Sequence, residues 1–326
     1  VHGSKARTMA LDAVLDRTAN VHESLREELL DGLLADEKFI NPKFFYDELG
    51  SSLFAEICTL PEYYPTRTEV SIYREHDDNI AASVGRGRVL VEPGAGACEK
   101  VRHLVSALEP ASYVPIDISG DFLQEAVADL REEFPALPVH PVAADFNEEL
   151  ELPPLQDSAP PLLFYPGSTI GNFTPEQAAE FLSRTAERLG SGSGLLIGYD
   201  LHKDSETLTA AYNDARGVTA RFNRNILTHA NNLLGTEFKT DAFDHLAFYN
   251  EDNQRIEMHL VSRDAQTLSC GDHDIEFTAG ERIHTEYSYK YTVADFSDLA
   301  DRAGYRSHEH WTDPQEWFAV HYLEAA

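Results

Sequence analysis

The chain has 326 residues, 42% of them hydrophobic and 10% aromatic, which is enough to bury the core of one large domain or two smaller ones. Its 56 acidic residues outnumber 26 basic ones and give a formal net charge of -30. That charge repels nucleic acid phosphates and anionic membranes, so we expect neither as a partner. The acidic excess fits either a salt-adapted protein or an ordinary solvated surface.

The cysteines and histidines predict no metal site and no disulfide framework. Cys58, Cys98 and Cys270 are odd in number and far apart, without CxxC or zinc spacing. The HEH cluster at 308–310 has no HExxH motif or facial triad beside it. The sequence contains no run of about 18 apolar residues, the length needed to span a membrane. Residues 1–30 lack the apolar core of a signal peptide. We therefore expect a reducing, cytoplasmic setting.

The first predicted elements are helical. Leucines recur at helical spacing over residues 25–34, and PKFFYDELGSSLFAEI continues with apolar residues three and four apart. PEYYPTRTE, residues 61–69, interrupts this pattern with two prolines around a pair of tyrosines. The pattern predicts an N-terminal helical part.

From about residue 86 to 200, short apolar runs alternate with helical stretches. The apolar runs are RVLVEPGAG, SYVPIDIS, VHPVAADF, LLFYPGS and GLLIGYDL, and the helical stretches between them include CEKVRHLVSAL, GDFLQEAVADLREEF and PEQAAEFLSRTAERL. This alternation is typical of βαβ units and predicts an α/β fold with a mostly parallel, doubly wound sheet. Such sheets bind ligands at the carboxyl ends of their strands.

The remaining third predicts an insertion and a return to the core. Residues 203–235 have helical spacing, residues 236–289 have partial period-2 alternation, and the C-terminal segment predicts one more helix and a closing hairpin. We therefore predict a Rossmann-like core formed by 67–202 plus 290–326. An inserted α+β domain, with the N-terminal helical part, would comprise 1–66 plus 203–289.

Three successive strand ends carry candidate ligand-binding residues. Gly94 and Gly96 follow the first strand, but Glu99 replaces the third glycine of GxGxxG and no P-loop lysine motif is present. Asp117 and Asp145 end the next two strands, and Asp117 has the spacing of a ribose-binding acid. An adenosyl ligand without a pyrophosphate fits this pattern, and S-adenosylmethionine fits it better than NAD or ATP. Capping of the following helices would explain any one carboxylate, but the series less well.

Several long motifs carry a resemblance to a known family. KFFYDELGSSLFAEI, LPEYYPTRTE, EPGAGACEK, FYPGSTIGNF, AYNDARGVTARFN and TEYSYKY, in that order, resemble the histidine-specific Nα-methyltransferases of ergothioneine biosynthesis, from about residue 39 to the C-terminus. The resemblance implies an S-adenosylmethionine-dependent enzyme that trimethylates the α-amino group of L-histidine to hercynine and releases S-adenosylhomocysteine. The superfamily is also similar to fungal enzymes that methylate a prenylated tryptophan. We expect a monomer whose partner is the small-molecule substrate.

The resemblance also implies roles for individual residues. Asp117 would bind the ribose of S-adenosylmethionine, and Asp145 and Phe146 the adenine. The implied cofactor-binding set is Gly94, Lys100, Asp117, Asp145 and Phe146.

On the substrate side, the resemblance implies a clamp on the amino acid. Asn172 and Tyr212 would hold its carboxylate or amino group, and Tyr63, with Tyr64 as the alternative, would reach the imidazole. The implied substrate-binding set is Tyr63, Asn172, Tyr212, Phe222, Met258, Glu286 and Ser288, and the implied catalytic set is Tyr46, Asn172 and Tyr212.

The chemistry of TEYS agrees with such a clamp. On a strand, Glu286 and Ser288 point to the same face and could hydrogen-bond both nitrogens of an imidazole. Without the resemblance, an ordinary strand with one solvent-exposed face would be the favoured explanation of TEYSYKY. Methyl transfer is a direct displacement that needs alignment and an unprotonated amine, not a strong base. A different aromatic amino acid as substrate and a non-catalytic adenosyl-binding protein remain the alternatives.

Overall fold

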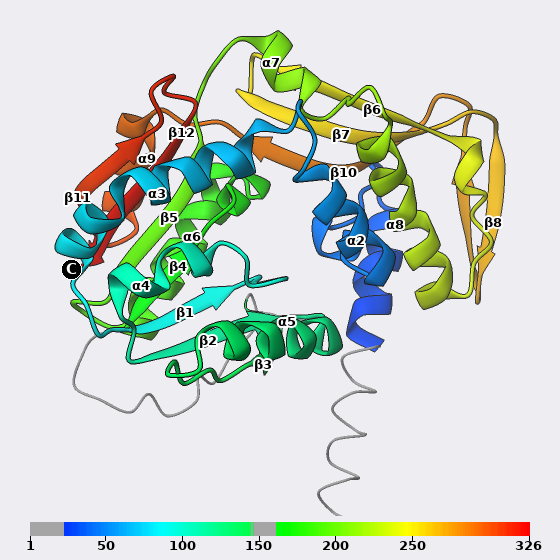
Figure 1. Cartoon of the computed structure of the whole chain (residues 1–326). Coiled ribbons are helices and arrows are strands. Elements are labelled where there is room, and N and C mark those ends of the chain that lie inside the picture. The colour runs from blue at the N-terminus through cyan, green and yellow to red at the C-terminus, as the bar shows by residue number, and fades with distance from the viewer. Residues whose placement is uncertain (1–22, 145, 147–160) are drawn as a thin grey trace, which may run out of the picture. The chain divides into compact units, whose positions relative to one another are not determined.

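A computed structural model of the chain describes residues 23–144, 146 and 161–326 (Figure 1). These residues form two compact units. The small unit comprises the described residues up to Leu53, Gly217–Ala247 and Met258–Glu286, and the large unit comprises Phe54–Arg216, Phe248–Glu257 and Tyr287–Ala326. The predicted domain boundaries at 66/67, 202/203 and 289/290 differ from these. Because compactness does not identify a bound ligand, the assignment of a substrate-binding domain stays a prediction.

The large unit contains a seven-stranded sheet in the order β11-β12-β5-β4-β1-β2-β3. Parallel pairing joins β1 to β2 and β4, β2 to β3, and β4 to β5, whereas β12 runs antiparallel to β5 and β11 antiparallel to β12. The strand order reverses at β1 and β4, as in a doubly wound sheet. The predicted Rossmann-like core and closing hairpin are therefore confirmed. The strands are β1 (Val89–Pro93), β2 (Ser112–Asp117), β3 (Val142–Ala143), β4 (Leu162–Tyr165), β5 (Gly194–Asp200), β11 (Tyr305–Thr312) and β12 (Phe318–Ala325).

Helices cover both faces of this sheet (Figure 1). On one face, α3 (Tyr64–Val84), α4 (Val105–Leu108) and α5 (Gly120–Glu133) pack over side chains such as Leu90 and Phe164. On the other, α6 (Pro175–Leu189) and α9 (Val293–Arg302) pack over the alternate side chains of the same strands. Central strands buried on two sides read as continuous apolar runs, which is why LLFY and GLLIGYD were recognisable as strands.

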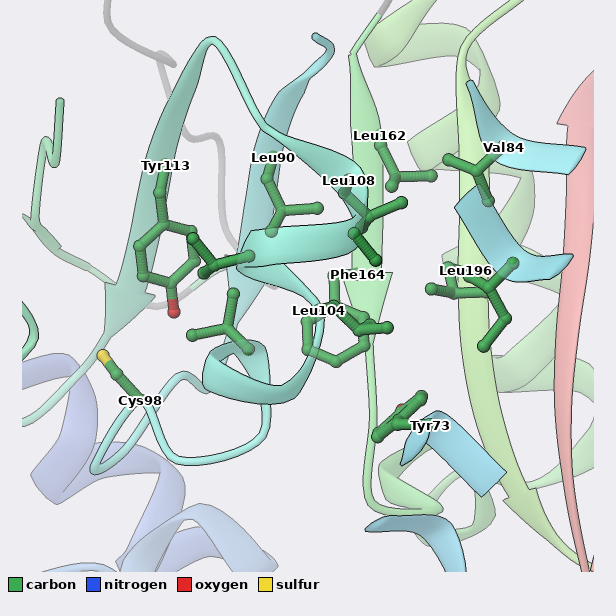
Figure 2. Close-up of a cluster of buried hydrophobic side chains, with 14 of the residues drawn as sticks. Tyr73, Val84, Leu90, Cys98, Leu104, Leu108, Tyr113, Leu162, Phe164 and Leu196 are labelled. Atoms are coloured by element: carbon green, nitrogen blue, oxygen red, sulfur yellow. The ribbon is translucent and has the colours of Figure 1, made fainter. Parts of the chain in front are cut away.

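Figure 2 shows the core on the α3 face, where Tyr73 and Val84 of α3 lie against Phe164 and Leu196 of neighbouring strands. Cys98 belongs to this core and is fully buried. Burial raises the pKa of its thiol to about 12, so it stays a protonated packing group.

Two helices differ from the sequence-based expectation. CEKVRHLVSAL, predicted as one helix, is broken into η2 (Val101–His103) and the four-residue α4, after a turn in which Cys98 takes a left-handed φ of 52°. PEYYPTRTE interrupts one helix but starts another, because α3 begins at Tyr64 with a proline in its first turn. Proline is tolerated there, since the first N–H groups of a helix have no intrahelical partner.

Residues 203–289 form helices followed by strands, as their sequence pattern predicts. The N-terminal part of the described chain is mostly helical. Residues 23–34 are helical, and β10-β7-β6 and β8-β9 form two further sheets. The elements are η1 (Pro42–Phe45), α2 (Glu48–Ile57), η3 (Thr169–Asn172), α7 (Ser205–Ala210), α8 (Val218–Leu234), η4 (Thr240–Ala242), β6 (Phe243–Asn250), β7 (Arg255–Ser262), β8 (Gln266–Cys270), β9 (His273–Phe277) and β10 (Arg282–Tyr289).

Candidate active site

The glycine turn after β1 lies against the carboxylate that ends β2. Gly94 and Gly96 have φ values of 66° and 51°, and a Cβ at either would meet open space. The Gly96 N–H donates to Asp117 Oδ2 at 2.9 Å, and the Ser119 N–H donates to Oδ1 at 2.9 Å. Asp117 therefore shapes the turn and the start of α5. Each of its oxygens keeps a second lone pair that can accept from a ligand hydroxyl.

Glu69 joins this turn to the loop after β4, a link that the sequence-based reasoning missed. Its buried carboxylate lies 2.7 Å from Lys100 Nζ, accepts from the Gly167 N–H at 2.9 Å and accepts from the Tyr73 hydroxyl at 2.8 Å. A Cβ at Gly198 would lie 2.2 Å from Glu69 Oε1, so glycine makes room for the carboxylate. The available signal was one acidic residue among the mostly apolar residues of the buried face of α3.

The loop after β4 is held at both ends, with Asn172 at its tip. Ser168 has a left-handed φ of 60°, and its Oγ accepts from the Asp200 N–H at 3.0 Å. At Gly171 a Cβ would lie 2.8 Å from the Tyr289 carbonyl oxygen, so the loop packs against the end of β10. Asn172 is the last residue of η3 and is half-buried. Its side chain makes no hydrogen bond to another described residue. A fixed backbone thus presents an amide that is available to a ligand.

Asp200, at the carboxyl end of β5, is the centre of a buried charge cluster. Its carboxylate lies 2.7 Å from Lys203 Nζ and 2.9 Å from Lys290 Nζ, and the Tyr64 hydroxyl donates to it at 2.6 Å. Burial alone would raise the pKa of Asp200, but the two ammonium groups hold it below the ordinary value. Burial lowers the pKa of Lys203 to about 8. The strand-end rule that singled out Asp117 would also have found Asp200.

The two adjacent tyrosines have different environments. Tyr64 is buried, and its hydroxyl also accepts from Lys203 Nζ at 2.9 Å. Tyr63 is half-buried, and its ring lies edge-on to that of Tyr212, with the centroids 6.4 Å apart. These environments favour Tyr63 over Tyr64 as a ligand-binding residue.

Phenylalanine substitutions should separate these roles. We expect Tyr64→Phe to lower the free energy of unfolding by about 1–3 kcal/mol, because it removes a buried partner of Asp200. Tyr63→Phe should leave thermal stability unchanged and raise the KM for the substrate about tenfold, the cost of one lost hydrogen bond. Melting curves and initial rates of both variants provide the measurement. A raised KM for Tyr64→Phe at unchanged stability would reverse the assignment.

The other predicted substrate-binding residues divide between the two units. In the small unit, the Phe222 ring of α8 packs edge-on to Tyr46 at 5.9 Å and stacks on Phe45 at 4.5 Å. Met258 of β7 and Glu286 of β10 are buried there. The large unit holds Tyr63, Asn172, Tyr212 and Ser288. Phe146, a predicted cofactor residue of the large unit, is buried against Phe181 with the rings 6.0 Å apart, and Asp145 lies outside the described residues.

Glu92 is a buried acid on β1 whose state should make stability depend on pH. Burial raises its pKa from 4.5 to about 8, although the Tyr113 hydroxyl donates to it and opposes the rise. Because the pKa of Glu92 is higher in the folded state than in the unfolded state, its contribution to the unfolding free energy is fully present below the unfolded-state pKa. That contribution is lost as the pH rises through about 8. Glutamine does not ionise, so Glu92→Gln should not show this loss. We therefore expect the unfolding free energy of the variant, relative to that of the wild type, to be higher at about pH 9 than at about pH 5. Denaturant unfolding at both pH values measures the gain, and an equal difference at both would contradict the burial argument.

Neither a metal centre nor a membrane span is present in the described part of the chain. Within residues 23–144, 146 and 161–326, no three or more His, Cys, Asp and Glu side chains gather in a way that could hold a metal ion. None of the helices described there is long and apolar enough to cross a membrane.

Comparisons with known proteins agree on one family. The family described as histidine-specific methyltransferase, SAM-dependent, matches residues 25–325. The chain is 43% identical to a histidine N-alpha-methyltransferase of Mycolicibacterium smegmatis, over 91% of this chain and 94% of that protein. It is 29% identical to ergothioneine biosynthesis protein 1 of Neurospora crassa, over 85% of this chain and 32% of that protein. A 4-dimethylallyltryptophan N-methyltransferase of Arthroderma benhamiae is 28% identical, over 92% of this chain and 93% of that protein.

Proposed function

Because the chain belongs to the family of S-adenosylmethionine-dependent, histidine-specific methyltransferases, we propose that it trimethylates the α-amino group of L-histidine to hercynine, the first step of ergothioneine biosynthesis. One observation in the fold carries this proposal. The glycine turn after β1, Asp117 at the end of β2 and the Asn172 loop after β4 all lie at the carboxyl ends of adjacent parallel strands of one sheet. This edge is where doubly wound sheets bind their ligands.

The residues of the large unit fit S-adenosylmethionine, which supplies the sulfonium methyl group when bound. Open space beside Gly94 lets a ligand approach the backbone. Asp117 would accept from the ribose hydroxyls, and the Lys100 ammonium, held by Glu69, suits the methionine carboxylate. Phe146, and Asp145 from outside the described residues, would bind the adenine.

The substrate residues would align the amine rather than activate it. Asn172 and Tyr212 would hold the amino and carboxylate groups, with Tyr63 beside Tyr212. Glu286 and Ser288 would hydrogen-bond the imidazole, and Tyr46, Phe222 and Met258 would line the pocket. Alignment of the lone pair with the sulfonium methyl supplies most of the rate enhancement in such a displacement. The product ammonium could lie against aromatic faces by cation-π attraction.

A tryptophan derivative is the alternative substrate, favoured by the similarity to the fungal 4-dimethylallyltryptophan enzyme. Glu286 and Ser288 together discriminate between the two, because they can pair with both nitrogens of an imidazole, whereas an indole has a single N–H donor and would leave one of them unpaired. We expect Glu286→Ala to lower kcat/KM for histidine about 100-fold relative to tryptophan, as the loss of a charge-assisted hydrogen bond implies. Rates with both amino acids measure this ratio. An unchanged ratio would remove Glu286 from ring recognition.

A turnover assay across the proteinogenic amino acids, with saturating S-adenosylmethionine, tests reaction and substrate together. Histidine should be the preferred acceptor. Preference for another amino acid would replace the substrate, and cofactor binding without turnover would indicate a non-catalytic adenosyl-binding protein.

We further propose a monomeric, cytoplasmic enzyme that needs no metal and binds neither nucleic acid nor membrane. The acidic net charge of -30 supports the last two points. Light scattering and an assay with a chelator test the oligomeric state and the metal requirement.

A further inference from the structure

Glu69 of α3 is a buried acid on which three donors from different parts of the large unit converge. Its side chain is fully buried, and Oε2 lies 2.7 Å from Lys100 Nζ. The Gly167 N–H donates to Oε1 at 2.9 Å and to Oε2 at 3.1 Å, and the Tyr73 hydroxyl donates to Oε1 at 2.8 Å. A cation, a backbone amide and a hydroxyl therefore share one carboxylate, whose two oxygens can accept from all three.

Two glycines leave the room that this arrangement needs. A Cβ at Gly198 of β5 would lie 2.2 Å from Glu69 Oε1, so the strand backbone is in close contact with the carboxylate. A Cβ at Gly167 would lie 2.7 Å from Lys100 Nζ, so the ammonium lies against the same residue whose N–H the carboxylate binds. A side chain at either position would displace one member of the ion pair. The ion pair and the start of the Asn172 loop are thus packed together.

We propose that Glu69 is a positioning residue for the amino-acid substrate, and that Lys100, besides its place in the cofactor site, supplies the positive charge that keeps Glu69 buried. This inference rests on the proposed function. Gly167 lies just after β4, at the start of the loop whose η3 ends at Asn172. The acceptor of the Gly167 N–H therefore sets where the loop leaves the strand, and with it where the Asn172 amide meets the substrate.

The charge of Glu69 explains why the lysine is part of this arrangement. A buried carboxylate that loses its cation is costly, so it takes up a proton or moves toward water. A proton turns one acceptor oxygen into a donor, and movement takes the acceptor away from Gly167. Loss of Lys100 should then disturb the amino-acid site as well as the cofactor site. An uncharged acceptor at residue 69 would not need the lysine.

The test compares glutamine with methionine at residue 69 in a protein that also carries Lys100→Met. Both side chains are uncharged and close in length to glutamate, but only glutamine has an oxygen that can accept from the Gly167 N–H. At saturating S-adenosylmethionine, kcat/KM for histidine should be about 100-fold lower with Glu69→Met than with Glu69→Gln, since a displacement of about 1 Å can cost that much. The Kd for S-adenosylhomocysteine, measured by calorimetry, should be the same in both.

Two outcomes of this comparison would overturn the inference. Equal kcat/KM for histidine in the two variants would show that Glu69 does not position the substrate loop through Gly167. An equal loss of affinity for S-adenosylhomocysteine with Glu69→Met would show general damage to the large unit, because a loop-specific effect leaves the cofactor in place.

Lys100→Met alone tests the role of the lysine. With Glu69 unchanged, the histidine KM at saturating S-adenosylmethionine should rise about tenfold, the cost of one disturbed hydrogen bond. Adding Glu69→Gln should bring the histidine KM back toward the wild-type value, whereas the weakened binding of S-adenosylhomocysteine should remain. A histidine KM that Lys100→Met leaves unchanged, or that Glu69→Gln does not restore, would contradict this role of Lys100.

Tyr73→Phe is the matched control, since it removes the third donor from the same carboxylate and keeps Lys100 and Gly167 in contact with it. It should lower the melting temperature and leave kcat/KM for histidine at the wild-type value. A loss as large as that of Glu69→Met would attribute the effect to packing around α3 and contradict the inference.

If the methionine variant does not fold, an ester in place of the peptide bond between Pro166 and Gly167 carries the test, because it removes the Gly167 N–H and leaves every side chain in place. kcat/KM for histidine should fall about tenfold at an unchanged Kd for S-adenosylhomocysteine. An unchanged kcat/KM would refute the inference. Failure of the wild type to methylate histidine defeats the proposed function, whereas wild-type turnover with equal constants in the compared variants defeats only this inference.

Discussion

Replacing Asn172 with alanine should lower kcat/KM for histidine at least 100-fold and leave the Kd for S-adenosylmethionine nearly unchanged. The loop that carries Asn172 is held by Glu69 at Gly167, by Asp200 at Ser168 and by the close approach of Gly171 to Tyr289. The backbone should therefore survive the substitution, and the loss falls on the contact with substrate. A lost hydrogen bond to a charged group costs about 1.5–3 kcal/mol, and misalignment of the amine adds to that.

Titration calorimetry with each ligand and steady-state rates measure the two halves of this prediction. Asn253→Ala, in the exposed turn between β6 and β7, makes the same chemical change outside the site and should match the wild type. Equal loss of affinity for cofactor and amino acid in Asn172→Ala would contradict the assignment of Asn172 to the substrate site.

The second large effect concerns Asp117, whose replacement should weaken cofactor binding rather than substrate binding. Asp117→Ala should weaken binding of S-adenosylmethionine about 100-fold, because two ribose hydroxyls lose a charged acceptor worth about 1.5 kcal/mol each. The variant also leaves the N–H groups of Gly96 and Ser119 without their partner, so the glycine turn should loosen as well. Once S-adenosylmethionine is saturating, the KM for histidine should change little.

Asp129→Ala is the control for this variant, since Asp129 is exposed on α5, the helix that Asp117 precedes. It should bind the cofactor as the wild type does. Unchanged cofactor affinity in Asp117→Ala would show that its carboxylate serves only to hold the turn and the helix start.

The core of the fold was predictable because its signals are local. Buried parallel strands such as LLFY and GLLIGYD leave continuous apolar runs, and the capping box of Thr174 and Gln177 marks the start of α6. The break between η2 and α4 was not predictable in this way. Their residues have ordinary helical spacing, and the left-handed turn at Cys98, whose side chain is buried in the core, has no local sequence signal.

The candidate site was only partly predictable, for a physical reason. Asp117 and Asn172 follow strands, so position in the chain pointed to them. Glu69 and Lys290 act through tertiary contacts with partners 31 and 90 residues away, Lys100 and Asp200, and no spacing rule links such pairs. Buried charges are costly unless paired, so each pair becomes informative only once burial is known.

The most direct test of the central claim is the product made from L-histidine and S-adenosylmethionine. We expect a histidine betaine that carries all three added methyl groups on the α-nitrogen, identified by mass and fragmentation, together with three equivalents of S-adenosylhomocysteine. No product under saturating cofactor, or methyl groups on the imidazole ring, would contradict the account.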